Sequence, residues 1–310
     1  MGKTAFIFPG QGAQYCGMGQ DFYEKTETGR KIFDRASELL GFSMPELCFK
    51  PNDRLDITEY TQAAMVTTSV AMLKVIEEMG VQADVAAGLS LGKYPALAAA
   101  GVMSTDDAIL TVRHRGILMQ EAVPAGVGGM SAVLGMTAEQ VNEVVDLFED
   151  VQVANYNCPG QIVISGKTEA VELAAEKLKE AGARRILPLN VSGPFHSGLL
   201  EEAGRKLGEY LKQVELHDPV IPYVANVTAD YVTNVIEVKP LLSKQVSSSV
   251  LWQQSVESMI ADGVDRFIEI GPGKTLAGFI KKIDRNVTVI NIEKVEDLEK
   301  LGVNSYEFNR

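Results

Sequence analysis

The sequence predicts an α/β protein with a mostly parallel sheet flanked by helices and an inserted ferredoxin-like (βαββαβ) subdomain. Two observations predict this class. Short apolar runs that indicate buried strands alternate with segments of helical spacing towards both ends of the chain, which favours a parallel sheet with helices on both faces. Between them, about 60 residues follow the order strand, helix, strand, strand, helix, strand, which is typical of a ferredoxin-like layer. A chain of 310 residues is long enough for both parts.

The first part of the chain supplies a strand, a long helix and a strand-turn-helix unit. TAFIF at 4–8 is a buried-strand pattern that the turn signal PGQG ends. A helical pattern at 59–79 stops before Gly80, a typical C-cap residue. The stretch VAAGLSLGKYPAL at 85–97 is predicted as strand, tight turn and helix. The capping sequence STDD then opens a helix that runs to about Glu121.

The pattern changes after this helix, so we expect a large domain of residues 1–125 and 191–310 and a small subdomain of residues 126–190. The expected strands of the small subdomain are 130–134, 151–155, 161–165 and 184–189, and its helices are 138–148 and 168–181. In the second part of the large domain we expect helices at 199–214, 240–246 and 253–261, strands at 221–225 and 266–270, and a last helix that GPGK begins.

The composition is that of a globular protein, with 46% hydrophobic and 23% charged residues. A net charge of −12 argues against non-specific nucleic-acid binding. The N-terminal apolar run is too short for a signal peptide, and no stretch approaches the ~20 apolar residues of a membrane span. Cys16, Cys48 and Cys158 are odd in number and scattered, which favours neither a disulfide framework nor a metal site. We therefore expect a cytoplasmic protein without a metal.

The stretch GLSLG at 88–92 lies between a predicted strand and a predicted helix. In a G-x-S-x-G elbow the chain turns sharply and holds the serine at the edge of the sheet. Gly88 and Gly92 are needed because larger side chains would collide across such a turn. Ser90 is therefore a candidate nucleophile, with the Leu91 N–H and the helix N-terminus facing a developing oxyanion. An ordinary serine in a glycine-rich loop remains the alternative on this motif alone.

A serine nucleophile needs a base, and the chain has three histidines. His196, in SGPFHSGLL, lies between the small subdomain and a helix, where a loop residue can reach the edge of the sheet. His217 lies in the turn sequence LHDP and is expected to be exposed. His114 lies in a helix between two arginines, which disfavours its protonated form. His196 is the best candidate base by elimination, and a structural histidine is the alternative.

Arg113 and Arg115 lie in one predicted helix, two residues apart, and so face different directions. One of them could be a surface charge while the other enters the site. A buried arginine beside an acyl site can hold a carboxylate through two parallel hydrogen bonds, worth about 1.5–3 kcal/mol each. Two solvated helix charges are the alternative.

These motifs together resemble the malonyl-CoA:acyl carrier protein transacylases of bacterial fatty-acid synthesis. The resemblance covers most of the chain, from Phe6 to about Ile280, and its motifs fall in the family's order. They are FPGQGAQYCGMG at 8–19, TQAAMVT at 61–67, GLSLG at 88–92, RGILMQEAVP at 115–124, NYNCPGQIVISG at 155–166, GPFHS at 193–197 and EIGPGKTLAG at 269–278.

The resemblance implies a role for several residues. Ser90 is similar to the nucleophile that carries the malonyl group, and His196 to the general base and acid. Arg115 resembles the arginine that holds the malonyl carboxylate. Gln245, in KQVSSSV, is similar to the residue whose main-chain carbonyl orients the histidine, which would explain why no third, acidic triad member presents itself.

The resemblance also implies a hydrolase-like α/β domain with a ferredoxin-like insertion. Gln11 and the backbone of Leu91 resemble the oxyanion hole. Phe195 is similar to the residue that favours malonyl over methylmalonyl groups in related acyltransferases. The implied reaction is a ping-pong transfer from malonyl-CoA to the phosphopantetheine thiol of an acyl carrier protein, without a further cofactor. A polyketide-pathway acyltransferase, a serine thioesterase or esterase, and a carrier-protein-binding module with weakened catalysis remain alternatives.

The carrier protein of such a pathway is acidic, as is this chain, so docking is expected to need a local basic patch. A monomer is expected. The candidates for the patch, chosen by charge alone, are Arg184, Arg185, Lys167 and Lys93.

Lys93 and Pro95 depart from the family, which usually has Glu and a small residue at these places. If Ser90 is the N-cap, Lys93 is the third helical residue, where an ammonium group is disfavoured by about 0.3–1 kcal/mol. Pro95 is then the fifth and loses a hydrogen bond to the Leu91 carbonyl, so a kink or a tightened first turn is expected. Two outcomes are open. If Lys93 pairs with a carboxylate or faces solvent, the enzyme is active, and this is the outcome we expect. In the other, the oxyanion hole is distorted and activity is reduced.

Overall fold

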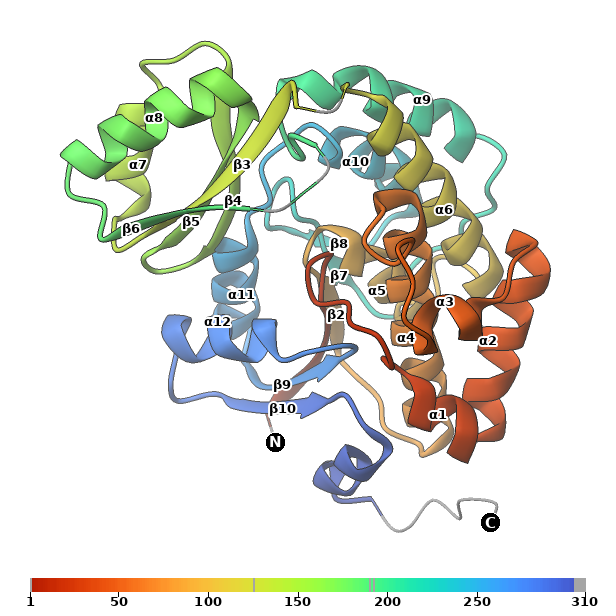
Figure 1. Ribbon diagram of the computed structural model, residues 1–310. Coiled ribbons are helices and arrows are strands. Elements are labelled where there is room, and N and C mark those ends of the chain that lie inside the picture. Colours follow the sequence, from red (N-terminus) through yellow and green to blue (C-terminus); the bar gives the residue numbers. More distant parts are fainter. Residues whose placement is uncertain (1, 125, 190, 192, 304–310) are drawn as a thin grey trace.

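A computed structural model describes residues 2–124, 126–189, 191 and 193–303. It confirms the predicted fold class, with a large α/β unit and a smaller unit beside it (Figure 1). The sheet of the large unit has six strands in the order β10-β9-β1-β2-β7-β8, and all neighbours pair in parallel except β7 and β8. Its strands are β1 Lys3–Phe8, β2 Val85–Gly88, β7 Tyr223–Val224, β8 Tyr231–Val232, β9 Val264–Ile270 and β10 Thr288–Ile292.

Alternate residues of the central strands enter two different cores, because successive side chains of a strand point to opposite faces. Ala5 and Ile7 pack in a core with Trp252, and Phe6 and Phe8 pack in a larger core on the other face. The helices of the smaller core are α11 Trp252–Ala261 and α12 Thr275–Ile283; those of the larger core include α4 Thr58–Glu78, α5 Lys93–Ala99, α6 Thr105–Glu121, α9 Glu201–Leu211 and α10 Val238–Gln245.

Residues 9–58 hold helices that the sequence patterns did not reveal: α1 Gln20–Lys25, α2 Glu27–Leu40 and α3 Met44–Phe49. The signals of α2 and α3 are side-chain caps, since the Thr26 hydroxyl accepts from Gly29 N–H and the Ser43 hydroxyl from Glu46 N–H; α1 follows Gly19 and has no such cap. The strands β8 and β10 were also not predicted. Both lie at an edge of the sheet, where little of a strand is buried.

The small unit confirms the predicted βαββαβ order. Its strands form an antiparallel sheet in the order β4-β5-β3-β6, and α7 and α8 cover one face of it (Figure 1). Its first strand begins at Gly128, two residues before the predicted start at 130. We propose residues 126–190 as its extent; residues 125 and 190 lie outside the described part. The elements are β3 Gly128–Leu134, α7 Ala138–Val145, β4 Val151–Cys158, β5 Gln161–Lys167, α8 Thr168–Glu180 and β6 Arg185–Pro188.

The two units are joined by backbone hydrogen bonds as well as by the chain. Tyr156 of β4 donates to the Val250 carbonyl at 3.0 Å, and Val250 N–H donates to Ala154 at 2.8 Å. The loops that follow β1, β2, β7 and β9 all leave the same edge of the large sheet, where α/β proteins place their sites. None of the helices in the described residues is long and apolar enough to cross a membrane.

Candidate active site

The elbow after β2 holds Ser90 in a left-handed backbone conformation, with φ of 51°. The predicted need for glycine on both sides is confirmed. A Cβ on Gly88 would lie 2.0 Å from the backbone of Gly92, and a Cβ on Gly92 would lie 2.1 Å from the Phe8 carbonyl oxygen. Close backbone contact therefore presents the Ser90 side chain at the edge of the sheet.

The structure brings Ser90 and His196 together from distant parts of the sequence. Ser90 Oγ lies 2.7 Å from His196 Nε2. On the other side of the ring, Nδ1 lies 2.9 Å from the carbonyl oxygen of Gln245. That carbonyl can only accept, so Nδ1 carries a proton and Nε2 is free to accept one from the serine hydroxyl. His196 is itself in the left-handed region, with φ of 59°.

Asn226, which the sequence analysis did not identify as a site residue, forms hydrogen bonds with the backbone of the elbow. Its Oδ1 accepts from Ser90 N–H at 2.8 Å and from Gln245 Nε2 at 2.8 Å, and its Nδ2 donates to the Gly88 carbonyl at 2.9 Å. Gln245 Nε2 also donates to the Ser90 carbonyl at 3.0 Å. One buried amide thus ties the serine to the residue that orients the histidine. Its signal in the sequence was a polar residue directly after the predicted strand at 221–225.

Gln152 of the small unit, also missed, supports the loop that carries His196. Its Nε2 donates to the His196 carbonyl at 2.9 Å, and its Oε1 accepts from Gly198 N–H at 2.9 Å. The backbone of His196 is strained, and these two bonds fix the chain at the histidine carbonyl and two residues after it. Nothing in the sequence set this residue apart from the other polar residues of its strand.

Arg115 enters the site, whereas Arg113 does not. Arg115 is 1% exposed; one terminal nitrogen donates to Gln62 Oε1 of α4 at 2.8 Å and the other lies 3.3 Å from Ser90 Oγ. Arg113 pairs with Glu59 at 2.7 Å and lies over the ring of Tyr60. The different directions expected of the two arginines are confirmed. Gln62 was part of the quoted TQAAMVT motif, but no role was assigned to it.

These side chains face one pocket of about 180 Å³ between the two units. Gln11, Leu91 and Phe195, predicted site residues, line it together with Ser90 and His196. Gln11 donates to the Thr58 hydroxyl at 3.2 Å. The small unit contributes to the wall, and α12 closes another side; lining residues from these two parts are Met130, Asn155, Asn157, Val163, Thr275 and Phe279.

The chain matches the model of the acyl transferase domain over residues 5–301. The chain belongs to the acyl transferase family. A curated relative from Bacillus subtilis (strain 168), a malonyl CoA-acyl carrier protein transacylase, is 47% identical over 304 residues, which is 96% of each chain. A crystal structure of the transacylase of that name from Clostridium perfringens is 46% identical, with a TM-score of 0.93 and 96% of each chain covered.

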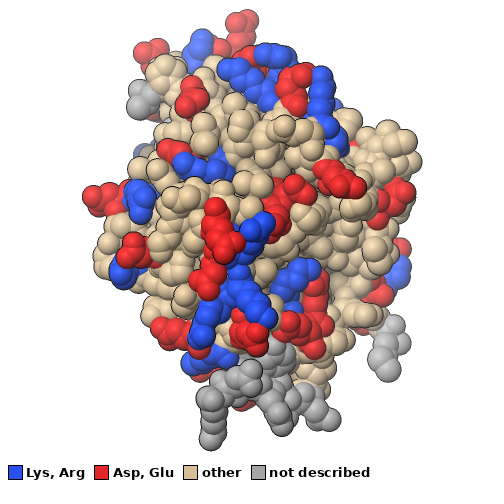
Figure 2. Space-filling model, turned by 90° about the vertical axis from the view of Figure 1, so that its right-hand side faces the viewer, with Lys and Arg blue, Asp and Glu red and all other residues tan. Residues whose placement is uncertain are grey.

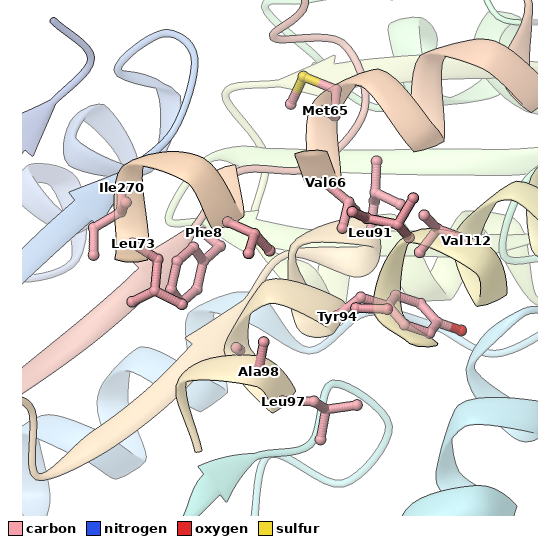
Figure 3. Packing of buried hydrophobic residues seen from close by; sticks show 14 of the residues in the cluster. Phe8, Met65, Val66, Leu73, Leu91, Tyr94, Leu97, Ala98, Val112 and Ile270 are labelled. Carbon is pink, nitrogen blue, oxygen red and sulfur yellow. The ribbon is translucent and has the colours of Figure 1, made fainter. Parts of the chain in front are cut away.

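A third comparison concerns a complex. A malonyl-transacylase solved with a holo type II PKS acyl-carrier protein is 37% identical to this acyl transferase, with a TM-score of 0.94. The match covers 96% of this chain and 98% of that one. The helices around the elbow therefore have the arrangement of known family members. Figure 3 shows Leu91 and Tyr94 of the elbow packed beside Val66 of α4 and Val112 of α6.

The elbow of this acyl transferase differs from the predicted geometry at its first turn. Ser90–Gly92 forms a 3-10 turn, so the expected tightening is confirmed, but α5 begins only at Lys93. Pro95 is therefore the third residue of α5 and not the fifth of a longer helix. At that position a backbone N–H has no partner within the helix, so proline removes no hydrogen bond there.

Both expectations for the Lys93 side chain are wrong. Lys93 is fully buried, so it neither faces solvent nor contributes to a basic docking patch. Its Nζ has no hydrogen-bond partner among the residues that the structure describes, so it pairs with none of their carboxylates. The elbow packs closely against the end of β1, and α5, which follows it, lies in the larger core. The side chain at 93, the first residue of α5, is therefore enclosed as well.

Charges around His196 favour its neutral form. Burial and the nearby positive charge of Arg115 lower the pKa of His196 to about 3, with a smaller lowering by Lys93 and an opposing hydrogen bond to Gln245. The imidazole is therefore neutral near pH 7 and able to accept a proton. The other histidines lie elsewhere: His217 is exposed, and His114 stacks on Tyr210 at 4.2 Å. Burial lowers the pKa of His114.

Proposed function

We propose that this acyl transferase moves a malonyl group from malonyl-CoA to the phosphopantetheine thiol of an acyl carrier protein through an ester on Ser90. The observation that carries the proposal is the placement of a serine-histidine pair and a buried arginine in one pocket, with the guanidinium 3.3 Å from Ser90 Oγ. The names of the Bacillus subtilis relative and of the carrier-protein complex support this assignment.

In the first half-reaction His196 Nε2 takes the proton of the Ser90 hydroxyl while Oγ attacks the thioester carbonyl. The oxyanion that forms is stabilised by Gln11 and the backbone N–H of Leu91. The intermediate collapses, the C–S bond breaks, and the CoA sulfur leaves with the proton that His196 returns. The Gln245 carbonyl keeps the imidazole in the required tautomer throughout.

The substrate carboxylate has two effects when it binds Arg115. It holds the acyl group in reach of Ser90 Oγ, because a guanidinium and a carboxylate form paired, directional hydrogen bonds. It also offsets the positive charge that lowers the pKa of His196. The base is therefore stronger when an anionic acyl group is present. Phe195 stands beside His196 in the pocket wall and limits the bulk of the acyl chain.

In the second half-reaction the carrier's phosphopantetheine thiol gives its proton to His196 and attacks the malonyl ester. The C–O bond to Ser90 then breaks, and His196 returns the proton to Ser90 Oγ. A neighbouring hollow of about 290 Å³ shares Gln11, Leu89 and Thr275 with the pocket and provides a path for the pantetheine arm. Both thioester partners are substrates, and the scheme uses no further cofactor. Three free cysteines fit a reducing compartment, so we place the reaction in the cytoplasm.

The test is the intact mass of the protein after brief mixing with malonyl-CoA. We expect a gain of one malonyl group, no gain in Ser90→Ala, and loss of the group when phosphopantetheinylated acyl carrier protein is added. Arg115→Ala should slow malonyl transfer at least about tenfold while sparing acetyl-CoA, since only malonyl has the carboxylate. A serine esterase or thioesterase would be insensitive to Arg115→Ala, and a carrier-binding module would form no ester.

A further inference from the structure

Lys93 is the buried charge that the proposed mechanism leaves unexplained. Its side chain is completely enclosed, and its Nζ has no hydrogen-bond partner in the described part of the chain. A buried, unpaired ammonium group is costly, and proteins rarely retain one without a use. It lies three residues after Ser90, in the helix that the elbow begins.

The surroundings of Lys93 are those of the acyl site. The charge of Arg115 acts on Lys93, and the charge of Lys93 acts on His196. The ring of Tyr94, next along the chain, lies 5.9 Å from the Arg115 guanidinium carbon. Arg115 Nε is also buried, and no described residue forms a hydrogen bond with it. Lys93, Arg115 and His196, which are positive or can become positive, therefore lie close enough to influence one another. A bound acyl carboxylate would supply the negative charge that they lack.

We propose that Lys93 is a specificity-determining residue, whose buried ammonium group attracts the acyl carboxylate and so favours an anionic acyl group over a neutral one. This inference deepens the proposed transfer and rests on it. Lys93 does not line the pocket, so it acts through the electric field and not by contact. In a water-poor interior such a field is screened much less than at the surface.

The direction of the pH dependence follows from burial. Burial and the charge of Arg115 lower the pKa of Lys93 to about 7 from its ordinary 10.5. A carboxylate bound nearby favours the ammonium form and raises that pKa. At low pH, Lys93 is therefore charged both in the empty site and in the site that holds a carboxylate. Above pH 7 it is neutral in the empty site. Preference for the anionic group is expected to be greatest below pH 7 and to fall as pH rises towards 9.

No other described charge on the elements packed against α5 accounts for such a profile. β2 has no titratable side chain, and Arg115, although burial lowers its pKa, stays charged over this range. The remaining charged side chains of β1, α4 and α6 are engaged elsewhere or exposed: Lys3 with Asp262, Glu59 with Arg113, Lys74 with Glu77, Glu78 with Thr28, Asp106 with Arg35, Asp107 with Ser104, and Glu121 in solvent. His114 of α6 stacks on Tyr210, and burial lowers its pKa from the ordinary 6.5, below the range over which the preference is expected to fall.

The experiment measures kcat/KM for ester formation from malonyl-CoA and from acetyl-CoA between pH 6 and 9. The ratio of the two values is the readout, because Ser90 and the CoA moiety act on both substrates, and because the pKa of His196, at about 3, lies well below the measured range. In the wild type the ratio should fall about tenfold, the size of a charge interaction that shifts a pKa by one unit. In Lys93→Met it should be low and independent of pH.

Two controls keep the result interpretable. The acetyl rate of Lys93→Met reports whether the variant is folded, and Lys274→Met removes an exposed charge beside the pocket residue Thr275. Lys274→Met should keep the wild-type fall in the ratio. A wild-type ratio independent of pH, or an unchanged fall in Lys93→Met, overturns the inference alone. If neither ester forms in the wild type, the proposed function fails and this inference fails with it.

Discussion

Two residues of the site, Ser90 and His196, are held in left-handed backbone conformations that a side chain with a Cβ rarely adopts. Such strain costs about 1–3 kcal/mol at each position and persists only where the surroundings enforce it. Here the enforcing groups are amide side chains, Asn226 at the serine and Gln152 at the histidine. These hydrogen bonds, together with the close backbone packing at Gly88 and Gly92, thus fix the 2.7 Å contact between the two side chains.

Asn226→Ala tests this at the scale of one residue. It leaves Ser90 N–H and Gln245 Nε2 without their acceptor, and each unpaired buried donor costs about 1–3 kcal/mol. We expect ester formation to slow at least about tenfold and the free energy of unfolding to fall by a similar few kcal/mol. Asn226→Asp keeps the Oδ1 acceptor but loses the donor to Gly88, so its rate should be intermediate. Quenched-flow mass spectrometry and denaturant unfolding measure the two effects.

A purely structural role would lower stability without lowering the rate. Thr26→Ala is the matched control, since Thr26 is a buried polar residue that caps α2 away from the site. Losing this cap should cost about 1 kcal/mol and leave ester formation unchanged. An Asn226→Ala enzyme that is destabilised yet reacts at the wild-type rate would contradict the role that we assign to the amide.

Among the elements, the pair α4 and α6 decides how the acyl carboxylate can be held. Gly116 lets these helices approach closely: a Cβ at this position would lie 2.7 Å from Glu59 Cα and 3.0 Å from the Thr58 carbonyl oxygen. The neighbouring Arg115 can therefore reach Gln62 across the interface at 2.8 Å. The packing of α6 against α4 therefore sets the position of the guanidinium group.

Gly116→Ala should push α6 away from α4. Overpacking of this kind costs about 1–3 kcal/mol in stability, and the shift of α6 loosens the Arg115 to Gln62 contact. We expect kcat/KM to fall more for malonyl-CoA than for acetyl-CoA, because only the malonyl group uses the arginine. Gly278→Ala in α12, where an added Cβ meets nothing within 4 Å, should change neither value. Equal losses with both substrates would show that the close approach does not position Arg115.

The same elements show what the sequence can and cannot predict. Strong periodicity and glycine or proline boundaries located α4, α6 and the six elements of the small unit, and the G-x-S-x-G pattern located Ser90. The helices of residues 9–58 are short or amphipathic with few apolar residues, and their polar caps were the weaker signal. The environment of Lys93 depends on a two-residue shift of the helix start, which a count of residues from Ser90 does not reveal. Asn226 and Gln152 act through partners that are distant in the sequence; the place of Asn226 directly after a predicted strand was a local signal, and Gln152 had none.

For the whole molecule, the net charge of −12 is spread over a surface of mixed sign. On the face in Figure 2, Lys and Arg side chains lie among Asp and Glu side chains. Of the expected basic patch, Lys167 is exposed but paired with Asp150 at 2.9 Å, which leaves Arg184 and Arg185 as exposed candidates. Arg185 begins β6, and Leu189, four residues on, lines the pocket. At about 3.3 Å per residue, this arginine lies about 13 Å along the strand from the pocket wall.

That distance is short enough for a carrier protein bound at Arg184 and Arg185 to place its flexible arm in the pocket. The double variant Arg184→Glu, Arg185→Glu should therefore raise KM for the carrier protein several-fold, and by less at high salt, where surface charges are screened. Ester formation from malonyl-CoA should stay as in the wild type, because neither arginine lines the pocket. Lys177→Glu, Lys179→Glu makes the same change in net charge on exposed positions of α8 and should leave KM unchanged. Equal increases in the two double variants would mean that total charge, and not a local patch, governs the encounter.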